Sequence, residues 1–307
     1  MRERTTTTSF VLSAFAFASA VAACGGGGGT TPDAPAADIG FNKPTVALKA
    51  NTEVSDNVWM ELGPADLACL NTASADMATT VEVALSTTVK DFQSGNLAPN
   101  TVVTAFPNQT VASPFDTQTA DGNAALTITI PIGTKRFGYK MTNPEALDTL
   151  LLNQIVKPDM PTQTEAQIQS VSKTTAATLP ALIGVSRTGG TGVLAGAVRD
   201  CAGHEISNYV ATVSSTQGQA TIITGADSYY FSSSVGLPVR HSQKEASSED
   251  GLFMVIELPP TAEAFVQVWG YPTDGDLAAD KLTLIAELAA PVVADTVITG
   301  SYEPLRQ

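Results

Sequence analysis

One stretch of this chain occurs twice, and it constrains the fold more than any other feature. The first copy runs from Thr119 to Pro131 and the second from Ser248 to Pro259. Each copy holds a polar approach, an Asp-Gly pair, an alternating apolar run and a closing proline. An Asp-Gly pair favours a tight turn, and alternation favours a half-buried β-strand. The duplication therefore predicts a mainly β chain built from two similar units.

Similar patterns flank both copies in the same order. A Val-Lys-Asp triplet ending at Asp91 precedes the first copy, and a Val-Arg-Asp triplet ending at Asp200 precedes the second. An alternating strand follows each copy, over Lys135–Met141 and Phe265–Trp269. We expect two β-sandwich domains.

The second unit resembles the carboxypeptidase regulatory-like domain. This resemblance implies a small transthyretin-like (Ig-like) β-sandwich, and it says hardly anything about function. In the first copy, Ala124 stands where an aromatic residue is usual, and a one-residue slip before Pro131 suggests a β-bulge. The residues that carry the resemblance are Val198-Arg199-Asp200, Asp250-Gly251-Leu252-Phe253, Leu258-Pro259-Pro260, Phe265-Val266-Gln267-Val268 and Gly270-Tyr271.

The segment between the units is predicted to be helical. Apolar residues recur there at helical spacing, and Thr162–Glu165 has the pattern of a capping box. Pro180 and Gly184 would kink and end the helix. The expected domains are a first β-sandwich over 41–143, a helical connector over 144–188 and a second β-sandwich over 189–307.

The N-terminus is typical of an exported protein. Arginines in Met1–Arg4 precede an apolar run, Phe10–Val21, that is too short to span a bilayer, so residues 1–23 are expected to be a signal peptide. Val21-Ala22-Ala23-Cys24 resembles the lipobox of bacterial lipoproteins. The resemblance implies a lipidated Cys24 carrying acyl chains such as palmitate, and Gly25 after it implies the outer membrane. The alternative is an ordinary signal peptide with Cys24 as a free thiol.

The composition limits the kinds of partner that this chain is expected to bind. Residues 24–40 are rich in Gly, Pro and Ala, which is typical of a flexible linker. The net charge of −14 disfavours nucleic acid and anionic lipid, so the membrane would be reached only through the lipid on Cys24. With Cys24 acylated, Cys69 and Cys201 remain as a pair that an oxidising compartment would bond, although two separate buried thiols are also possible.

Three groups of residues are candidates for chemistry. Asp274, Asp276 and Asp280 could bind calcium, with a surface turn as the alternative. Only two histidines exist, His204 and His241, so no His-based triad or zinc site is expected. We expect no cofactor. The aromatic residues of the second unit could form an exposed platform for a sugar or a partner, or could be ordinary core residues; they are Tyr229, Tyr230, Phe231, Trp269 and Tyr271.

The sequence leaves three functions open. The first is a non-catalytic envelope lipoprotein that presents a β-sandwich to a protein or glycan partner. The second is an exported or envelope-anchored hydrolase that uses the carboxylates Asp200, Glu205 or Asp250. A cavity that gathers two of these carboxylates would favour the enzyme. The third is an accessory subunit, for which a contiguous apolar patch on one sheet is expected.

Overall fold

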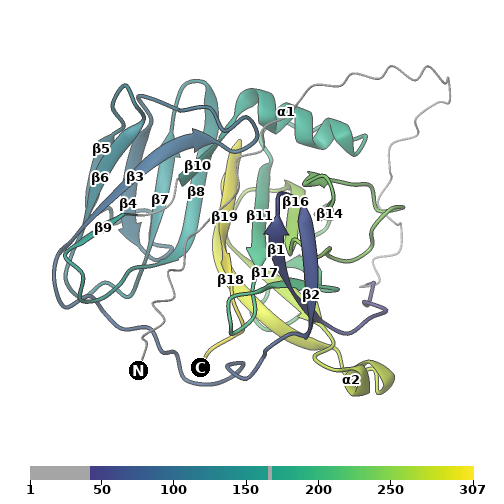
Figure 1. Ribbon diagram of the computed structural model, residues 1–307. Helices are drawn as coiled ribbons and strands as arrows, with labels where there is room; N and C mark the ends of the chain where they lie inside the picture. Colours follow the sequence, from purple (N-terminus) through teal and green to yellow (C-terminus); the bar gives the residue numbers. More distant parts are fainter. Residues whose placement is uncertain (1–41, 165–167) are drawn as a thin grey trace.

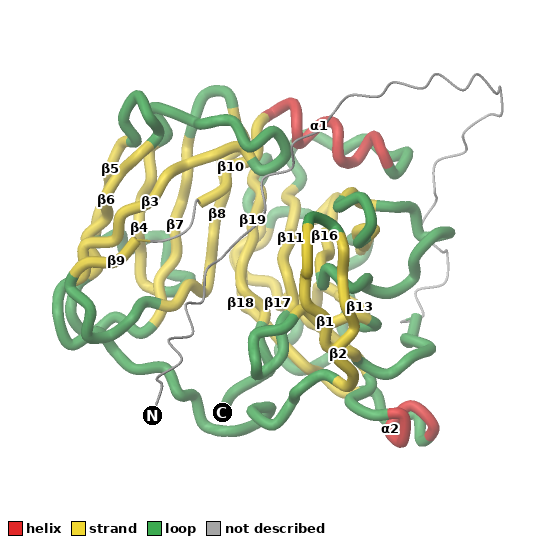
Figure 2. The backbone as a smooth tube through the Cα atoms, viewed as in Figure 1, coloured by secondary structure: helices red, strands yellow, loops and turns green. Residues whose placement is uncertain are grey.

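The computed structural model describes residues 42–164 and 168–307. These residues form nineteen strands and two helices, which confirms the mainly β prediction (Figures 1 and 2). The predicted signal peptide and linker, including Cys24, lie outside the described residues. Among the residues described, no helix is long and apolar enough to cross a membrane.

The first unit is a β-sandwich. One layer has the order β6-β3-β10 with β9 beside β3, and the other has the order β5-β4-β7-β8. Every second residue of β3 is buried, as the alternation predicts, and these side chains meet those of β6 and β7 in one core. The strands are β3 (Val83–Asp91), β4 (Val102–Pro107), β5 (Asp116–Thr119), β6 (Ala125–Ile130), β7 (Arg136–Thr142), β8 (Ala146–Ile155), β9 (Thr162–Thr164) and β10 (Ile168–Ser172).

The second unit repeats this arrangement. Its layers are β15-β14-β16-β11-β19 and β13-β17-β18, around a core that includes Leu194, Phe253 and Val266. Its elements are β11 (Gly192–Val198), β12 (Glu205–Ser207), β13 (Val210–Ser214), β14 (Asp227–Ser232), β15 (Leu237–Pro238), β16 (Leu252–Leu258), β17 (Thr261–Gly270), α2 (Asp274–Ala278), β18 (Thr283–Val292) and β19 (Thr296–Tyr302).

The two copies of the repeated stretch make the same pairings. In the first unit β3 pairs with β6 and β4 with β7, and in the second unit β11 pairs with β16 and β13 with β17, all antiparallel. The β-bulge lies in the second copy and not in the first, since the register shifts opposite Val193 and Glu257 has a φ of 61°. The first copy instead has a longer turn that ends at Ala124, whose φ is 58°.

Strand β8 joins the units. It pairs with β7 and β10 of the first unit and, in parallel, with β19 of the second, so one sheet continues across both (Figure 1). Its side chains alternate between two cores: Leu150 and Leu152 belong to the core of the second unit, and Leu151 packs against that of the first. The sheet therefore makes the two units one continuous body.

The prediction of a helical connector over 144–188 is wrong for most of its length. β8, β9 and β10 occupy the segment, and only α1 (Lys173–Leu182) is helical. The spacing of the leucines in β8 is compatible with a helix and with a strand. The segment forms a strand because it pairs with neighbours on both edges and is covered on both faces. The predicted capping box lies partly outside the described residues, and Ser172 caps the helix instead, accepting a hydrogen bond from the Thr175 amide at 3.1 Å.

The N-terminal hairpin belongs with the second unit. It consists of β1 (Lys49–Ser55) and β2 (Val58–Pro64). β1 pairs with β12, giving a three-stranded sheet in the order β12-β1-β2. The predicted first domain, 41–143, includes this hairpin, and the structure corrects that assignment. The described chain thus begins on the second unit, crosses to the first and returns.

Candidate functional site

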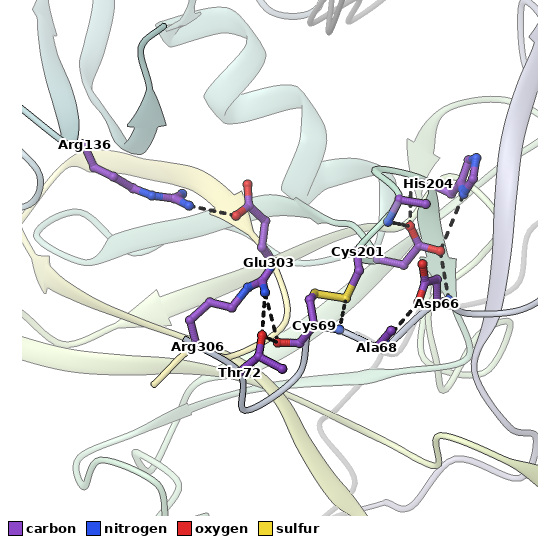
Figure 3. The surroundings of a disulfide bond; sticks show 11 residues. Asp66, Ala68, Cys69, Thr72, Arg136, Cys201, His204, Glu303 and Arg306 are labelled. Carbon is purple, nitrogen blue, oxygen red and sulfur yellow. Dashed lines mark hydrogen bonds and ion pairs between the residues drawn. A yellow bond between two sulfur atoms is a disulfide. The ribbon is translucent and has the colours of Figure 1, made fainter. Parts of the chain in front are cut away.

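A disulfide bond fastens the segment that crosses between the units (Figure 3). It joins Cys69, in the loop after β2, to Cys201, in the turn after β11, with the two Cα atoms 5.7 Å apart. The amide of Cys201 also donates to the carbonyl of Asp66 at 2.9 Å. The predicted pairing of the two cysteines is confirmed, and it closes a loop with a sequence separation of 132 residues.

Two arginines connect the region of the disulfide to the first unit and to the C-terminal residues (Figure 3). Arg306 donates to the Cys69 carbonyl at 3.2 Å and to Thr72 Oγ1 at 2.8 Å. Arg136, on β7, pairs with Asp76 at 2.6 Å and with Glu303 at 2.9 Å. Burial raises the pKa of Asp76, but the hydrogen bond and charge of Arg136 outweigh it and hold that pKa below its usual value. The region is a structural junction.

Two of the carboxylates named for the alternative hydrolase hypothesis, Asp200 and Glu205, stabilise the turn after β11. Asp200 is buried, and its Oδ1 accepts hydrogen bonds from the amides of Ala202 and His204, both at 2.9 Å. Its Oδ2 accepts from the Asp66 amide at 3.0 Å. Glu205 forms an ion pair with Arg199 at 3.1 Å. Both carboxylates are therefore engaged in holding the turn.

Asp250 is the third of these carboxylates. It is buried, its Oδ1 accepts from the Leu252 amide at 3.1 Å, and its Oδ2 has no hydrogen-bond partner among the described residues. Burial outweighs that hydrogen bond and raises the pKa of Asp250 to about 7. Neither Asp250 nor the other two carboxylates line either of the two cavities described below, so neither cavity has the geometry expected of the hydrolase.

The aromatic group does not form an exposed platform. Tyr229, Tyr230, Phe231 and Tyr271 are buried, and Trp269 is half-buried. Tyr230 packs in the core of the second unit, whereas Tyr229 and Phe231 pack beneath Ile183, at the end of α1. The core interpretation of these aromatics therefore holds, because α1 and the loop after it cover the outer face of the sheet.

The calcium candidate does not assemble either. Asp276 accepts a hydrogen bond from Thr273 Oγ1 at the start of α2, and Asp280 is engaged by Lys43 and by the Tyr271 hydroxyl, both at 2.6 Å. Asp274 lies in the first turn of α2. Over residues 42–164 and 168–307, no group of three or more His, Cys, Asp or Glu side chains is arranged to hold a metal ion.

Two cavities lie where the sequence predicted nothing. An apolar cavity of about 170 Å³ lies beneath α1, over the seam between β8 and β19; its lining includes Leu151, Ala195 and Met254. This volume suits one small apolar group, since an apolar cavity of about 150 Å³ holds a benzene molecule. The signal for it was the unbroken apolar run of β16, which indicates a strand covered on both faces.

The second cavity is polar and more open. It has a volume of about 710 Å³ and lies between the loop after β3 and the start of α1. Its lining includes Asp91 and Glu145. The Asp91 carboxylate is already engaged by the amide of Ser172 at 2.8 Å and by the amide and hydroxyl of Ser94 at 2.9 and 2.8 Å.

Exposed apolar side chains gather on the N-terminal hairpin. We call Val54, Val58, Met60 and Leu62 the hairpin patch; each is 43–55% exposed. No other stretch of nine residues in the described part of the chain carries as many large exposed apolar side chains. The signal in the sequence was the alternation over Val58–Leu62, whose apolar positions face outward rather than into a core.

Comparisons with known proteins give only distant structural similarities and assign this chain to no family. No protein-family model and no curated protein matches this chain. Among solved structures, it is similar to the Bacillus anthracis TIE protein, with 12% identity, a TM-score of 0.25 and coverage of 73% of this chain. It spans only 34% of the length of that protein. The shaft pilin SpaA from Lactobacillus rhamnosus GG is 12% identical, with a TM-score of 0.22 and coverage of 75% of this chain and 98% of that one.

Proposed function

We propose that this chain is a non-catalytic cell-envelope lipoprotein, a structural or binding module that presents its β-sandwiches to a protein or glycan partner. In this proposal residues 1–23 are a signal peptide, and lipid on Cys24 anchors the protein in the outer membrane. Each unit is a transthyretin-like sandwich of the kind that the carboxypeptidase regulatory-like resemblance implies.

The observation that supports a non-catalytic role is that none of the three candidate carboxylates lines either of the two cavities. Asp200 and Glu205 are engaged by the turn after β11, and Asp250 is buried away from both cavities. General acid-base catalysis needs a group within hydrogen-bond reach of a bound substrate. The pKa of about 7 for Asp250 is a feature that favours a hydrolase.

The hairpin patch supports a partner. An exposed apolar cluster lowers the solubility of a protein, and such clusters often mark interaction surfaces. Of the three functions that the sequence leaves open, the accessory subunit is the one for which an apolar patch on one sheet is expected, and it too acts through a partner protein. The fastened junction between the units suits this role too, because a rigid module loses less conformational entropy on binding.

The test of the anchor compares the natively expressed protein with Cys24→Ser. We expect the intact mass of the native protein to include a diacylglyceryl group and its acyl chains, and the protein to enter the detergent phase. Both properties should be absent from the variant. A soluble native protein with an unmodified Cys24 would overturn the lipoprotein part of the proposal.

The test of the partner is cross-linking in intact cells with a photoreactive residue at exposed positions of the module. We expect defined adducts with an envelope component at some positions and none at others. A module that gives no adduct at any exposed position would overturn the binding role.

A further inference from the structure

The outer edge of β2 is a free strand edge. β2 is the last strand of the sheet β12-β1-β2, and it pairs only with β1 among the described residues. Its main-chain amides and carbonyls on the other side are therefore available to another strand. Native proteins usually protect such edges with lysines, prolines or bulges, because an unprotected edge recruits extended chains.

The protection on β2 is confined to its ends. The register with β1 shifts between Ala50 and Asn51 and between Glu53 and Ser55, and Pro64 closes the strand. Between these points Trp59, Met60 and Glu61 stay in regular register. No Lys or Arg lies on the strand. The middle of β2 is thus an unprotected edge beside the hairpin patch.

The charges of the hairpin indicate which kind of partner strand could pair with the edge of β2. The hairpin carries three acidic residues, Glu53, Asp56 and Glu61, but only one basic residue, Lys49. Lys49 Nζ lies 3.9 Å from Glu61 Oε1. The whole chain carries a net charge of −14. A second copy would bring the same carboxylates and the same net charge to the edge, and like charges at an interface weaken association. A basic strand would meet complementary charge.

We propose that the edge of β2 binds an extended segment of a partner protein in which apolar residues alternate with Lys or Arg. Main-chain hydrogen bonds to β2 would supply the pairing, as in β-strand addition generally. The apolar residues of the segment would cover Met60 and its neighbours in the hairpin patch, and its cations would meet Glu53 and Glu61. This inference rests on the proposed function, since it names the partner of that module.

The experiment measures binding of fluorescent peptides to the full-length chain in detergent. The probe is a peptide of alternating Lys and Val. Three analogues replace Lys by Glu, replace Val by Ser, or carry N-methyl groups at alternate amides. We expect each analogue to bind at least about tenfold more weakly, because each removes one of the three contributions. Equal binding of all four peptides would overturn the proposal.

Variants locate the site. Met60→Lys places a cation in the middle of the edge and should weaken binding of the Lys-Val peptide about tenfold or more. Met77→Lys makes the same change at another exposed methionine, which lies outside the hairpin, and should leave binding unchanged. Peptide binding that survives Met60→Lys overturns the proposal. A concentration-dependent dimer that Met60→Lys abolishes would also overturn it, by making a second copy the occupant.

The inference and the proposed function fail in different ways. Cross-linking of the Met60→Lys variant in intact cells separates them. Envelope adducts that persist at full yield would refute the role of the β2 edge and leave the binding module standing. The absence of adducts from the unaltered chain would refute the proposed function itself. We expect adducts from the unaltered chain and from Met77→Lys, and their loss in Met60→Lys.

Discussion

Asp91 and Asp200 occupy equivalent positions in the two units, and each carboxylate holds the turn that follows its strand. Asp91 Oδ1 accepts from the Ser94 amide at 2.9 Å, and Asp200 Oδ1 accepts from the Ala202 amide at the same distance. In both cases the second oxygen receives an amide from a segment far away in the sequence, Ser172 or Asp66. The repeated Asp is therefore a structural residue of the fold.

The first prediction concerns these two carboxylates. Asp91→Ala leaves two amides and two hydroxyls without their acceptor, and Asp200→Ala leaves three amides without theirs. Each change should lower the free energy of unfolding by about 2–3 kcal/mol, since hydrogen bonds to charged groups are being lost from a buried site. Urea unfolding measures it. A loss of less than about 0.5 kcal/mol for both would contradict the structural role.

For Asp91 the effect should depend on pH. Burial raises the pKa of this carboxyl, but hydrogen bonds from Ser94 and Ser172 outweigh burial and lower it. A lowered pKa in the folded state means that the stability is present above the pKa of the unfolded state and is lost as the pH falls through the folded value. The difference between native protein and Asp91→Ala should therefore shrink in acid. A difference that stays constant down to the acid transition would refute this.

The disulfide gives the second prediction. Replacing both Cys69 and Cys201 by Ser opens a loop with a sequence separation of 132 residues. In the chain-entropy model this costs on the order of 4–5 kcal/mol, because the unfolded chain gains freedom. Urea unfolding under non-reducing conditions measures the loss. The native protein with added reductant should lose the same amount of unfolding free energy. A urea midpoint that does not change would mean that the disulfide restricts the unfolded chain very little.

Arg136 gives the third prediction. Arg136→Met removes the pairs with Asp76 and Glu303 and keeps an apolar side chain of similar length. The partly buried carboxylates then lose their partner, so stability should fall by about 1–3 kcal/mol. Lys43→Met removes the exposed pair with Asp280 and serves as the matched control, with little change expected. Equal losses of stability in the two variants would mean that the ion pairs of Arg136 contribute no more to stability than an exposed surface ion pair.

The strands could be predicted from the sequence because their signals are local. The Asp-Gly turns and the alternation of Val83–Asp91 fix both the strand and the face it buries. The pairing of Cys69 with Cys201 followed from the parity of the cysteines. The sequence left the burial of Tyr229 as one of two alternatives, because its cover comes from Ile183, which lies far from it along the chain.

β8 shows a second limit. Leu147, Leu150 and Leu151 satisfy a helical period, and only the partners on both sides of the strand decide its state. The free edge of β2 is likewise a property of the sheet and not of the sequence, since an alternating strand is the same whether its outer neighbour is present or absent.

The last prediction concerns Asp250, whose pH dependence should be opposite to that of Asp91. Its folded-state pKa is raised to about 7, so the fold favours the protonated acid. Stability is then fully present below about pH 3.9, the ordinary pKa of an aspartate, and is lost as the pH rises towards 7, by on the order of 4 kcal/mol. Asp250→Asn keeps the acceptor for Leu252 and does not titrate, so its advantage over the native protein should grow between these pH values and then level off. Urea unfolding at several pH values measures this, with Asp121→Asn in the exposed turn of the first copy as a control for the loss of a carboxylate. An advantage that is the same at pH 4 and pH 7 would mean that the Asp250 carboxyl is ionised throughout and finds a partner through a local rearrangement.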